Sequence, residues 1–168
     1  MEERTRSTAG AAVPLELGAL YEAYADMIYR LALVRTRNRA DAEDVLQDVF
    51  FRCLRRQPKF KDEEHQKAWL ITAAIRSSSS LLTRADRRHG VGAAALDYLS
   101  TEYDTDDTVY TAVMGLPEKY RTAVHLFYYE GYSVEEIGRM TDTKPATVKS
   151  HLHRAREALR QGLKEDVE

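Results

Sequence analysis

The sequence is poor in the residues that build disulfide frameworks, metal centres and membrane spans. Its 168 residues include one cysteine, Cys53, so no disulfide can form within the chain, and a reducing, cytoplasmic setting is the simplest interpretation. The five histidines have no pair of thiolates to join them, so we expect no metal and no other cofactor. The longest uncharged run, Thr108–Pro117, has ten residues. A membrane-spanning helix needs about 20, so we expect no membrane insertion.

The usual motifs of enzymes are missing as well. We find no Gly-rich phosphate loop, no Cys/His pair at a useful spacing, and no pair of carboxylates set apart from the solvated helix faces. The sequence therefore argues against an enzyme.

Signals for β-strands are almost absent. The chain has no Asn-Gly or Asp-Gly pair and little alternation of β-branched residues. Apolar residues instead recur every three or four positions, as in the run from Leu17 to Ala32. Further helices are predicted after Asp41, which suits an N-cap, and over about residues 63–88 and 117–130. We therefore expect an all-α fold.

Basic and acidic residues are unevenly distributed, although the net charge is only −2. Residues 51–90 carry 10 basic and 4 acidic side chains, whereas residues 91–112 carry 5 acidic and none basic. The basic segment is compatible with DNA binding, and a solvated helix face is the plainer alternative.

A change in composition divides the chain. Residues 90–107 combine glycines, small residues and acids, and they are predicted to be a flexible linker. They would join two small helical domains, residues 15–89 and 108–165, after a flexible N-terminus of residues 1–14.

The second domain contains a pattern typical of a helix-turn-helix. Ser133 and Glu136 form a capping box, Asp142 and Thr143 make a short turn, and Thr143 can cap a last helix that starts near Pro145. That helix is expected to enter the major groove of DNA, with an ordinary amphipathic helix as the alternative. Side chains of its polar face and start are the candidate DNA contacts: Lys144, Thr147, Lys149, Ser150, His151, His153, Arg154 and Arg156.

These motifs resemble those of a known family. The segments 131–137 (GYSVEEI) and 147–156 (TVKSHLHRAR) closely resemble region 4 of extracytoplasmic-function (ECF) sigma factors, the small two-domain members of the sigma-70 family. Residues 41–50 (DAEDVLQDVF) resemble regions 2.1 and 2.2, and residues 68–71 (AWLI) resemble the start of region 2.3. The resemblance covers about residues 15–165.

The resemblance implies several partners. It implies binding to core RNA polymerase, through the β′ clamp helices and the β flap, and recognition of the −35 and −10 elements of promoter DNA. It also suggests an anti-sigma factor that masks both domains. The matching acidic and apolar segment implies contacts with core polymerase by Asp41, Glu43, Asp44, Gln47, Asp48, Phe50 and Phe51. For its acids, the alternative is simple solvation of a helix and complementarity to its dipole.

The third helix resembles the region that opens the −10 element and holds its single strand. Such binding needs positive charge, stacking surfaces and polar groups that read a flipped base. The candidate residues are Lys67, Trp69, Arg76, Ser77, Ser80, Arg84, Arg87 and Arg88. A lone tryptophan among apolar residues is more often part of a core, so Trp69 has that alternative.

This helix also departs from the family pattern. Arg76 stands where Asn is usual and Ser80 where Asp is usual, with the serine run Ser77–Ser80 between them. Either the strand-separating surface is remodelled, or promoter melting is weakened, or the stretch was engineered. In region 4, Asp142 replaces a usual Gly, and His151 replaces a common Arg and would lose one phosphate contact unless protonated.

Two alternative functions stay open at this point. The first is a stand-alone helix-turn-helix regulator, which would leave the acidic second helix and the basic third helix unexplained. The second is a variant that binds polymerase or an anti-sigma factor but is impaired in melting.

Overall fold

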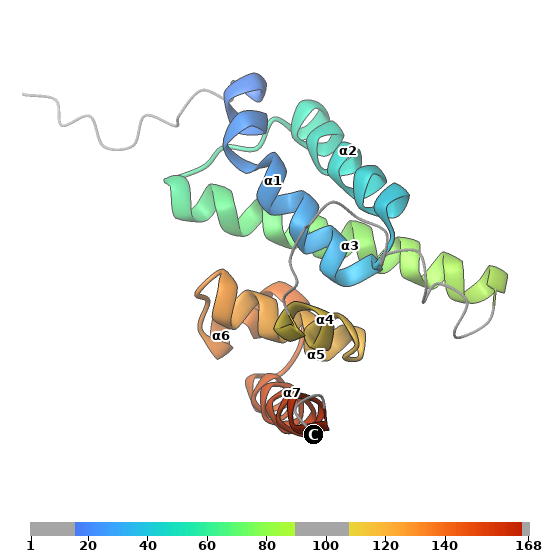
Figure 1. Cartoon of the computed structure of the whole chain (residues 1–168). Coiled ribbons are helices and arrows are strands. Elements are labelled where there is room, and N and C mark those ends of the chain that lie inside the picture. Colours follow the sequence, from blue (N-terminus) through green and yellow to red (C-terminus); the bar gives the residue numbers. More distant parts are fainter. Residues whose placement is uncertain (1–15, 90–107, 166–168) are drawn as a thin grey trace, which may run out of the picture.

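The computed structural model of the chain describes residues 16–89 and 108–165, and within them every regular element is helical (Figure 1). The prediction of an all-α fold is confirmed. The predicted N-terminal segment 1–14 and linker 90–107 lie outside the described residues. The elements are α1 (Leu17–Thr36), α2 (Arg39–Arg56), α3 (Glu63–His89), α4 (Thr108–Met114), α5 (Glu118–Val124), η2 (His125–Tyr129), α6 (Val134–Thr141) and α7 (Pro145–Glu165).

Helices α1, α2 and α3 pack together as a bundle. Its centre consists of fully buried apolar side chains, among them Ile28, Val49 and Leu70. Cys53 is buried there too, and burial raises the pKa of its thiol to about 11. At neutral pH this thiol is protonated and acts as a small apolar core residue.

The start of α2 differs from the prediction. Asn38, and not Asp41, is the N-cap: its side-chain carbonyl accepts a hydrogen bond of 2.9 Å from the backbone N–H of Asp41. Asp41 lies in the first turn instead, where a negative charge complements the helix dipole. Both residue types cap helices well, so the sequence alone did not separate them.

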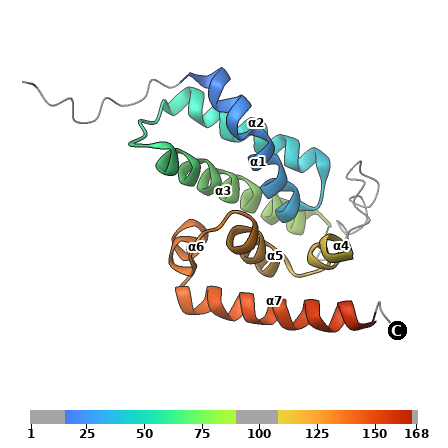
Figure 2. The same cartoon turned by 60° about the vertical axis from the view of Figure 1, so that its left-hand side comes forward.

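The second group of helices, α4 to α7, lies beneath the first. In both views α5 and α6 form a middle layer between the α1–α3 bundle and α7, so α7 is on the outer side of the molecule (Figures 1 and 2). Between α5 and α6 the chain makes the π-helical turn η2 and stops at Gly131, whose φ of 76° suits glycine.

Buried arginine side chains join the two groups. Arg121 of α5 is 3 % exposed, and its guanidinium donates to the carbonyl oxygens of Val34 and Arg35 at the end of α1, at 2.7 and 3.1 Å. The last carbonyls of a helix have no partner within the helix. Arg121 thus caps a helix of the other group with positive charge, which favours one orientation of the two groups.

Candidate DNA and polymerase interfaces

The capping box that opens α6 has the predicted geometry. The backbone N–H of Ser133 donates to the carboxylate of Glu136 at 2.8 Å, and the backbone N–H of Glu136 donates to the Ser133 hydroxyl at 3.2 Å. Two N–H groups that the helix cannot satisfy internally are satisfied in this way. The start of α6 is therefore fixed by its own sequence.

The turn between α6 and α7 is tight. Asp142 has a φ of 52°, so the residue that replaces the usual Gly adopts the left-handed conformation expected of it. The backbone N–H of Thr143 donates to the carbonyl of Gly138 at 2.8 Å, and a Cβ atom on Gly138 would lie 2.6 Å from the carbonyl oxygen of Thr143. Only glycine allows so close an approach of the turn to the helix.

The predicted cap of α7 is wrong by one residue. The hydroxyl of Thr143 donates to the carbonyl of Thr141, whereas the first backbone hydrogen bonds of α7 are accepted by the carbonyl of Lys144. Pro145 is the first helical residue, a position where its missing N–H costs nothing.

Helix α7 separates an apolar face from a polar one. Val148, Leu152 and Ala155 are buried against the rest of the domain. Six of the eight candidate DNA contacts are exposed: Lys144, Thr147, Lys149, His153, Arg154 and Arg156. Ser150 and His151 are half-buried. Helix α7 therefore presents hydroxyl and basic groups to solvent over the part of its surface that is not buried.

Two tyrosines, which the sequence analysis did not single out, contact the basic side chains of α7. Tyr128 accepts a hydrogen bond of 2.6 Å from Nε of Arg156, and the guanidinium lies 5.7 Å from the centre of the ring. Tyr120 accepts a longer one, 3.5 Å, from Arg154. A tyrosine that holds a guanidinium lowers the entropy lost when that group binds a phosphate.

His151 does not supply positive charge. Its ring lies 5.5 Å from that of Tyr120. Burial, followed by the nearby Lys119 and Arg154, lowers the pKa of its imidazole. The ring is therefore neutral at neutral pH and replaces the cation of the usual Arg with an uncharged group.

An apolar groove lies between α1 and α2. Its volume is about 720 Å³, and it contains the large exposed side chains of Phe51 and Leu54, which are 63 % and 53 % exposed. Four of the seven predicted polymerase contacts line it: Glu43, Gln47, Phe50 and Phe51. The wall from α1, with Tyr21 against the Phe50 ring at 4.9 Å, was not predicted.

The other three predicted polymerase contacts lie outside the groove lining. Asp48 pairs with Arg52 on the same helix at 3.0 Å. Asp44 is exposed, and Asp41 lies in the first turn, where burial and then Asp44 raise the pKa of its carboxyl. Acidic groups thus accompany an apolar groove, an arrangement suited to a partner with apolar and basic side chains.

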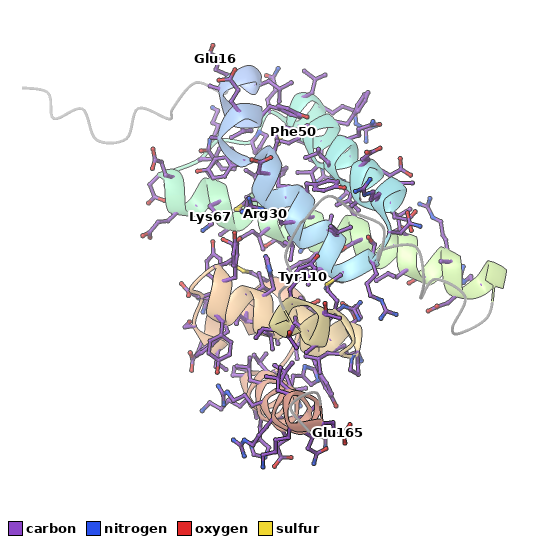
Figure 3. The ribbon with its side chains drawn as sticks, viewed as in Figure 1. Glu16, Arg30, Phe50, Lys67, Tyr110 and Glu165 are labelled. Atoms are coloured by element: carbon purple, nitrogen blue, oxygen red, sulfur yellow. The ribbon has the colours of Figure 1, made fainter. Side chains whose placement is uncertain are left out.

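The predicted −10 residues of α3 fall into separate places. Lys67, Trp69 and Arg76 line a cleft of about 620 Å³ that lies between α3 on one side and α6, with the loop before it, on the other. The ring of Trp69 also lies 5.8 Å from that of Phe60. Figure 3 labels Lys67 on the side of α3 toward α6. Ser77 is buried, 5 % exposed. Ser80, Arg84 and Arg87 are exposed further along the helix, and the side chain of Arg88 lies outside the described residues.

Among residues 16–89 and 108–165, no three His, Cys, Asp or Glu side chains come together as a metal site. In the same part of the chain, no helix is long and apolar enough to cross a bilayer.

Known protein families match both helix groups. The family model of Sigma-70 region 2 matches residues 20–88, and that of Sigma-70, region 4, matches residues 106–159. The ECF RNA polymerase sigma factor SigL of Mycobacterium tuberculosis is 32 % identical over 170 residues, which cover 95 % of each chain. The RNA polymerase sigma factor SigV of Bacillus subtilis is 28 % identical over 143 residues, 83 % of this chain and 86 % of that relative.

Solved structures share the fold. The sigma factor RpoE of Bartonella quintana, in complex with the anti-sigma factor NepR, superposes with a TM-score of 0.74 at 23 % identity, over 89 % of this chain and 97 % of that one. CnrH, in complex with the cytosolic domain of CnrY, gives 0.60 at 18 % identity. The two region models in order, and a relative matched along nearly its whole length, show that this chain belongs to the sigma-70 family as an ECF sigma factor, which directs promoter-specific transcription by RNA polymerase.

Proposed function

We propose that the two groups of helices divide the work of promoter recognition. Residues 15–89 act as region 2, which binds core polymerase and the −10 element, and residues 108–165 act as region 4, which binds the −35 element. Residues 90–107 act as the linker. The exposed hydroxyl and basic face of α7, on the outer side of the molecule, is the observation that carries this proposal.

The face of α7 supports a role in reading duplex DNA. Thr147 and Lys149 lie in its first turns, where the N-terminal part of a recognition helix meets the base edges. Arg154 and Arg156 are also exposed, on different sides of the helix because residues two positions apart lie about 200° apart around its axis, and both suit contacts with phosphates. His151, neutral at neutral pH, acts as a donor or an acceptor and adds no charge.

The groove between α1 and α2 supports a role in binding core polymerase. A helical partner such as the β′ clamp helices can place apolar side chains against Phe51 and Leu54 and basic ones near Glu43. Large exposed apolar side chains in a concave surface are a common mark of a protein interface. Contact of region 4 with the β flap would hold the second domain on the same enzyme.

We also propose a cytoplasmic location and a protein anti-sigma partner. Core polymerase and promoter DNA are in the cytoplasm, and the RpoE relative is described in complex with an anti-sigma factor. An anti-sigma factor would compete with polymerase for exposed apolar surface such as the α1–α2 groove.

Run-off transcription tests the proposal. The protein is mixed with purified bacterial core RNA polymerase and a pool of templates with randomised −35 and −10 elements, either duplex or opened in advance at −10. We expect enrichment of one pair of elements among the duplex templates that give transcripts. If no template is used and no complex with core forms, the polymerase assignment is wrong, and a stand-alone regulator becomes the better reading.

The burial of Ser77 favours a second candidate function, a sigma factor impaired in melting. Ser77 and Ser78 are 5 % and 0 % exposed, so this part of the serine run does not present hydroxyls to DNA in this conformation. Transcripts from the pre-opened templates alone would establish that second function.

A further inference from the structure

We propose that Tyr128 of η2 is a positioning residue for DNA binding, because it holds the guanidinium of Arg156 in α7 ready to bind a backbone phosphate. The proposal deepens the proposed function, since it rests on α7 as the helix that binds the −35 element. Both residues belong to the α4–α7 group. Their contact therefore does not depend on how that group packs against the rest of the chain.

The contact between the two side chains leaves one edge of the guanidinium open. Nε of Arg156 donates to the Tyr128 hydroxyl at 2.6 Å, and the guanidinium carbon lies 5.7 Å from the centre of the ring. Within the described residues, the two terminal amino groups of Arg156 have no hydrogen bond or ion pair. Arginine binds phosphate through a planar fork of N–H groups. The edge formed by Nη1 and Nη2 is therefore available to a phosphate while Nε stays on the tyrosine.

The tyrosine is itself held in place. Its ring lies 5.0 Å from that of Phe127, edge to face, and Phe127 packs against the hydrophobic core. The backbone of the turn is closed by a hydrogen bond of 3.0 Å from the N–H of Glu130 to the carbonyl of His125, the spacing of a π turn. Tyr128 remains 58 % exposed, so a phosphate can approach the pair from solvent. A group that is ordered in advance loses less entropy on binding.

Arg156 lies on a basic flank of α7 that includes Lys149 and Arg160, all three exposed. At 3.6 residues per turn, Arg156 and Arg160 are each within about 20° of Lys149 around the helix axis, and about 10 and 16 Å from it along the axis. The major groove is about 12 Å wide. A helix that places Lys149 at the base edges therefore brings Arg156 and Arg160 to the level of the phosphates.

The next residue along the chain provides a matched control. Tyr129 also belongs to η2 and is 61 % exposed, but its hydroxyl accepts a hydrogen bond from Arg30 of α1 and not from α7. Tyr129→Phe thus removes the same atom from the same turn as Tyr128→Phe. Both substitutions keep the aromatic ring, so the contact of the Tyr128 ring with the guanidinium is retained.

Binding of duplex DNA to the full chain tests the proposal. The probe is a fluorescent duplex selected from a randomised pool by its binding to the wild-type chain, and anisotropy is measured at several salt concentrations. Arg156→Ala should weaken binding about tenfold and lower by about 1 the steepness with which the logarithm of the binding constant falls with the logarithm of salt concentration. Tyr128→Phe should weaken binding about threefold without changing that steepness, because the phosphate contact is kept and only its ordering is lost. Tyr129→Phe should bind like wild type.

A double-mutant cycle separates positioning from direct contact. In the Arg156→Ala background, Tyr128→Phe should have no further effect, since the group that it positions is gone. An equal loss in both backgrounds would mean that the tyrosine hydroxyl touches DNA or supports the fold in general. An unchanged affinity of Tyr128→Phe would mean that the hydroxyl does not order Arg156. Either result would overturn the proposal.

Nuclear magnetic resonance of arginine side chains gives a measurement without DNA. The Nε–H signal of Arg156 is assigned by its loss in Arg156→Lys. In wild type and in Tyr129→Phe this proton should exchange with water about fivefold more slowly than in Tyr128→Phe, since a hydrogen-bonded N–H must open before it exchanges. Equal exchange in the three proteins would contradict the proposed contact.

The variants also separate the role of Tyr128 from the role of α7. If Arg156→Ala weakens binding and Tyr128→Phe does not, α7 still binds DNA and only the positioning role is wrong. If wild type binds no duplex in the pool, or if Lys149→Ala and Arg156→Ala change nothing, the assignment of α7 to DNA fails, and the positioning role fails with it.

Discussion

The tight turn of the helix-turn-helix leads to a prediction in which the position of one backbone atom decides whether a substitution stabilises or destabilises the protein. Substitution Gly138→Ala adds a Cβ atom 2.6 Å from the carbonyl oxygen of Thr143. Ordinary contacts of this kind are longer, so the turn must move away from α6 by several tenths of an ångström. The atom in the way belongs to the backbone, and no rotation of a side chain can relieve it.

The expected magnitude follows from two opposing effects. Alanine favours the interior of a helix over glycine by about 1 kcal/mol. Overpacking against a rigid neighbour costs about 1–3 kcal/mol. At this distance from a backbone oxygen we expect the cost to win, with a net loss of about 1–2 kcal/mol in the free energy of unfolding.

Gly162 provides a matched control. A Cβ atom there would have nothing within 4 Å, and the residue lies in α7. Gly162→Ala should therefore stabilise the protein by up to about 1 kcal/mol. The two substitutions are chemically identical, so a difference in sign isolates the contact with Thr143.

Urea denaturation of the full chain, followed by circular dichroism, measures both effects. The midpoint should fall for Gly138→Ala and rise for Gly162→Ala, with the slope unchanged. Equal stabilisation by the two substitutions would refute the reasoning, because it would mean that the turn does not approach α6 as closely as described.

Other surfaces lead to further predictions. Arg154→Ala should weaken binding to selected −35 duplex DNA. It should also lower by about 1 the steepness with which the logarithm of the binding constant falls with the logarithm of salt concentration, measured by fluorescence anisotropy. An unchanged salt dependence would remove this residue from the interface. Phe51→Ala should lower affinity for core polymerase about tenfold with little change in stability, since the ring is exposed; equal affinity would argue against the groove. Asn38→Ala should cost about 1 kcal/mol, and Asp41→Ala less, if the observed cap is correct. Burial raises the pKa of Glu130, but His125 and Lys67 lower it by more, so the net shift is downward. The ionised form of Glu130 therefore stabilises the ion pair with Lys67 above the ordinary carboxyl pKa, and that contribution should be lost as the pH falls through the lowered pKa, seen as a lower midpoint of urea denaturation.

The sequence predicted the elements well where local signals determine them. The capping box at Ser133 and Glu136 and the periodic apolar positions of α7 involve residues a few positions apart, and the structure confirms them. The cap predicted at Asp41 lies at Asn38 instead, because the two side chains cap equally well and the sequence alone does not separate them.

Contacts between distant segments could not be predicted in this way. The partner of Lys67 lies 63 residues further along the chain, and those of Arg35 lie on two other helices. Periodicity gives the face of a helix but not which helix covers it. Sequence reasoning therefore found the unusual serine run but not its contact with Arg35.

The position of α7 on the outer side of the molecule has a consequence for the order of promoter binding. Helix α7 lies on the side of α5 and α6 away from the α1–α3 bundle (Figure 2), and its hydroxyl and basic side chains are exposed. Duplex DNA can therefore reach α7 while α5 and α6 stay packed against the first group of helices. The upstream element can then be bound first, and the side of α3 that faces α6 is reached only in a second step.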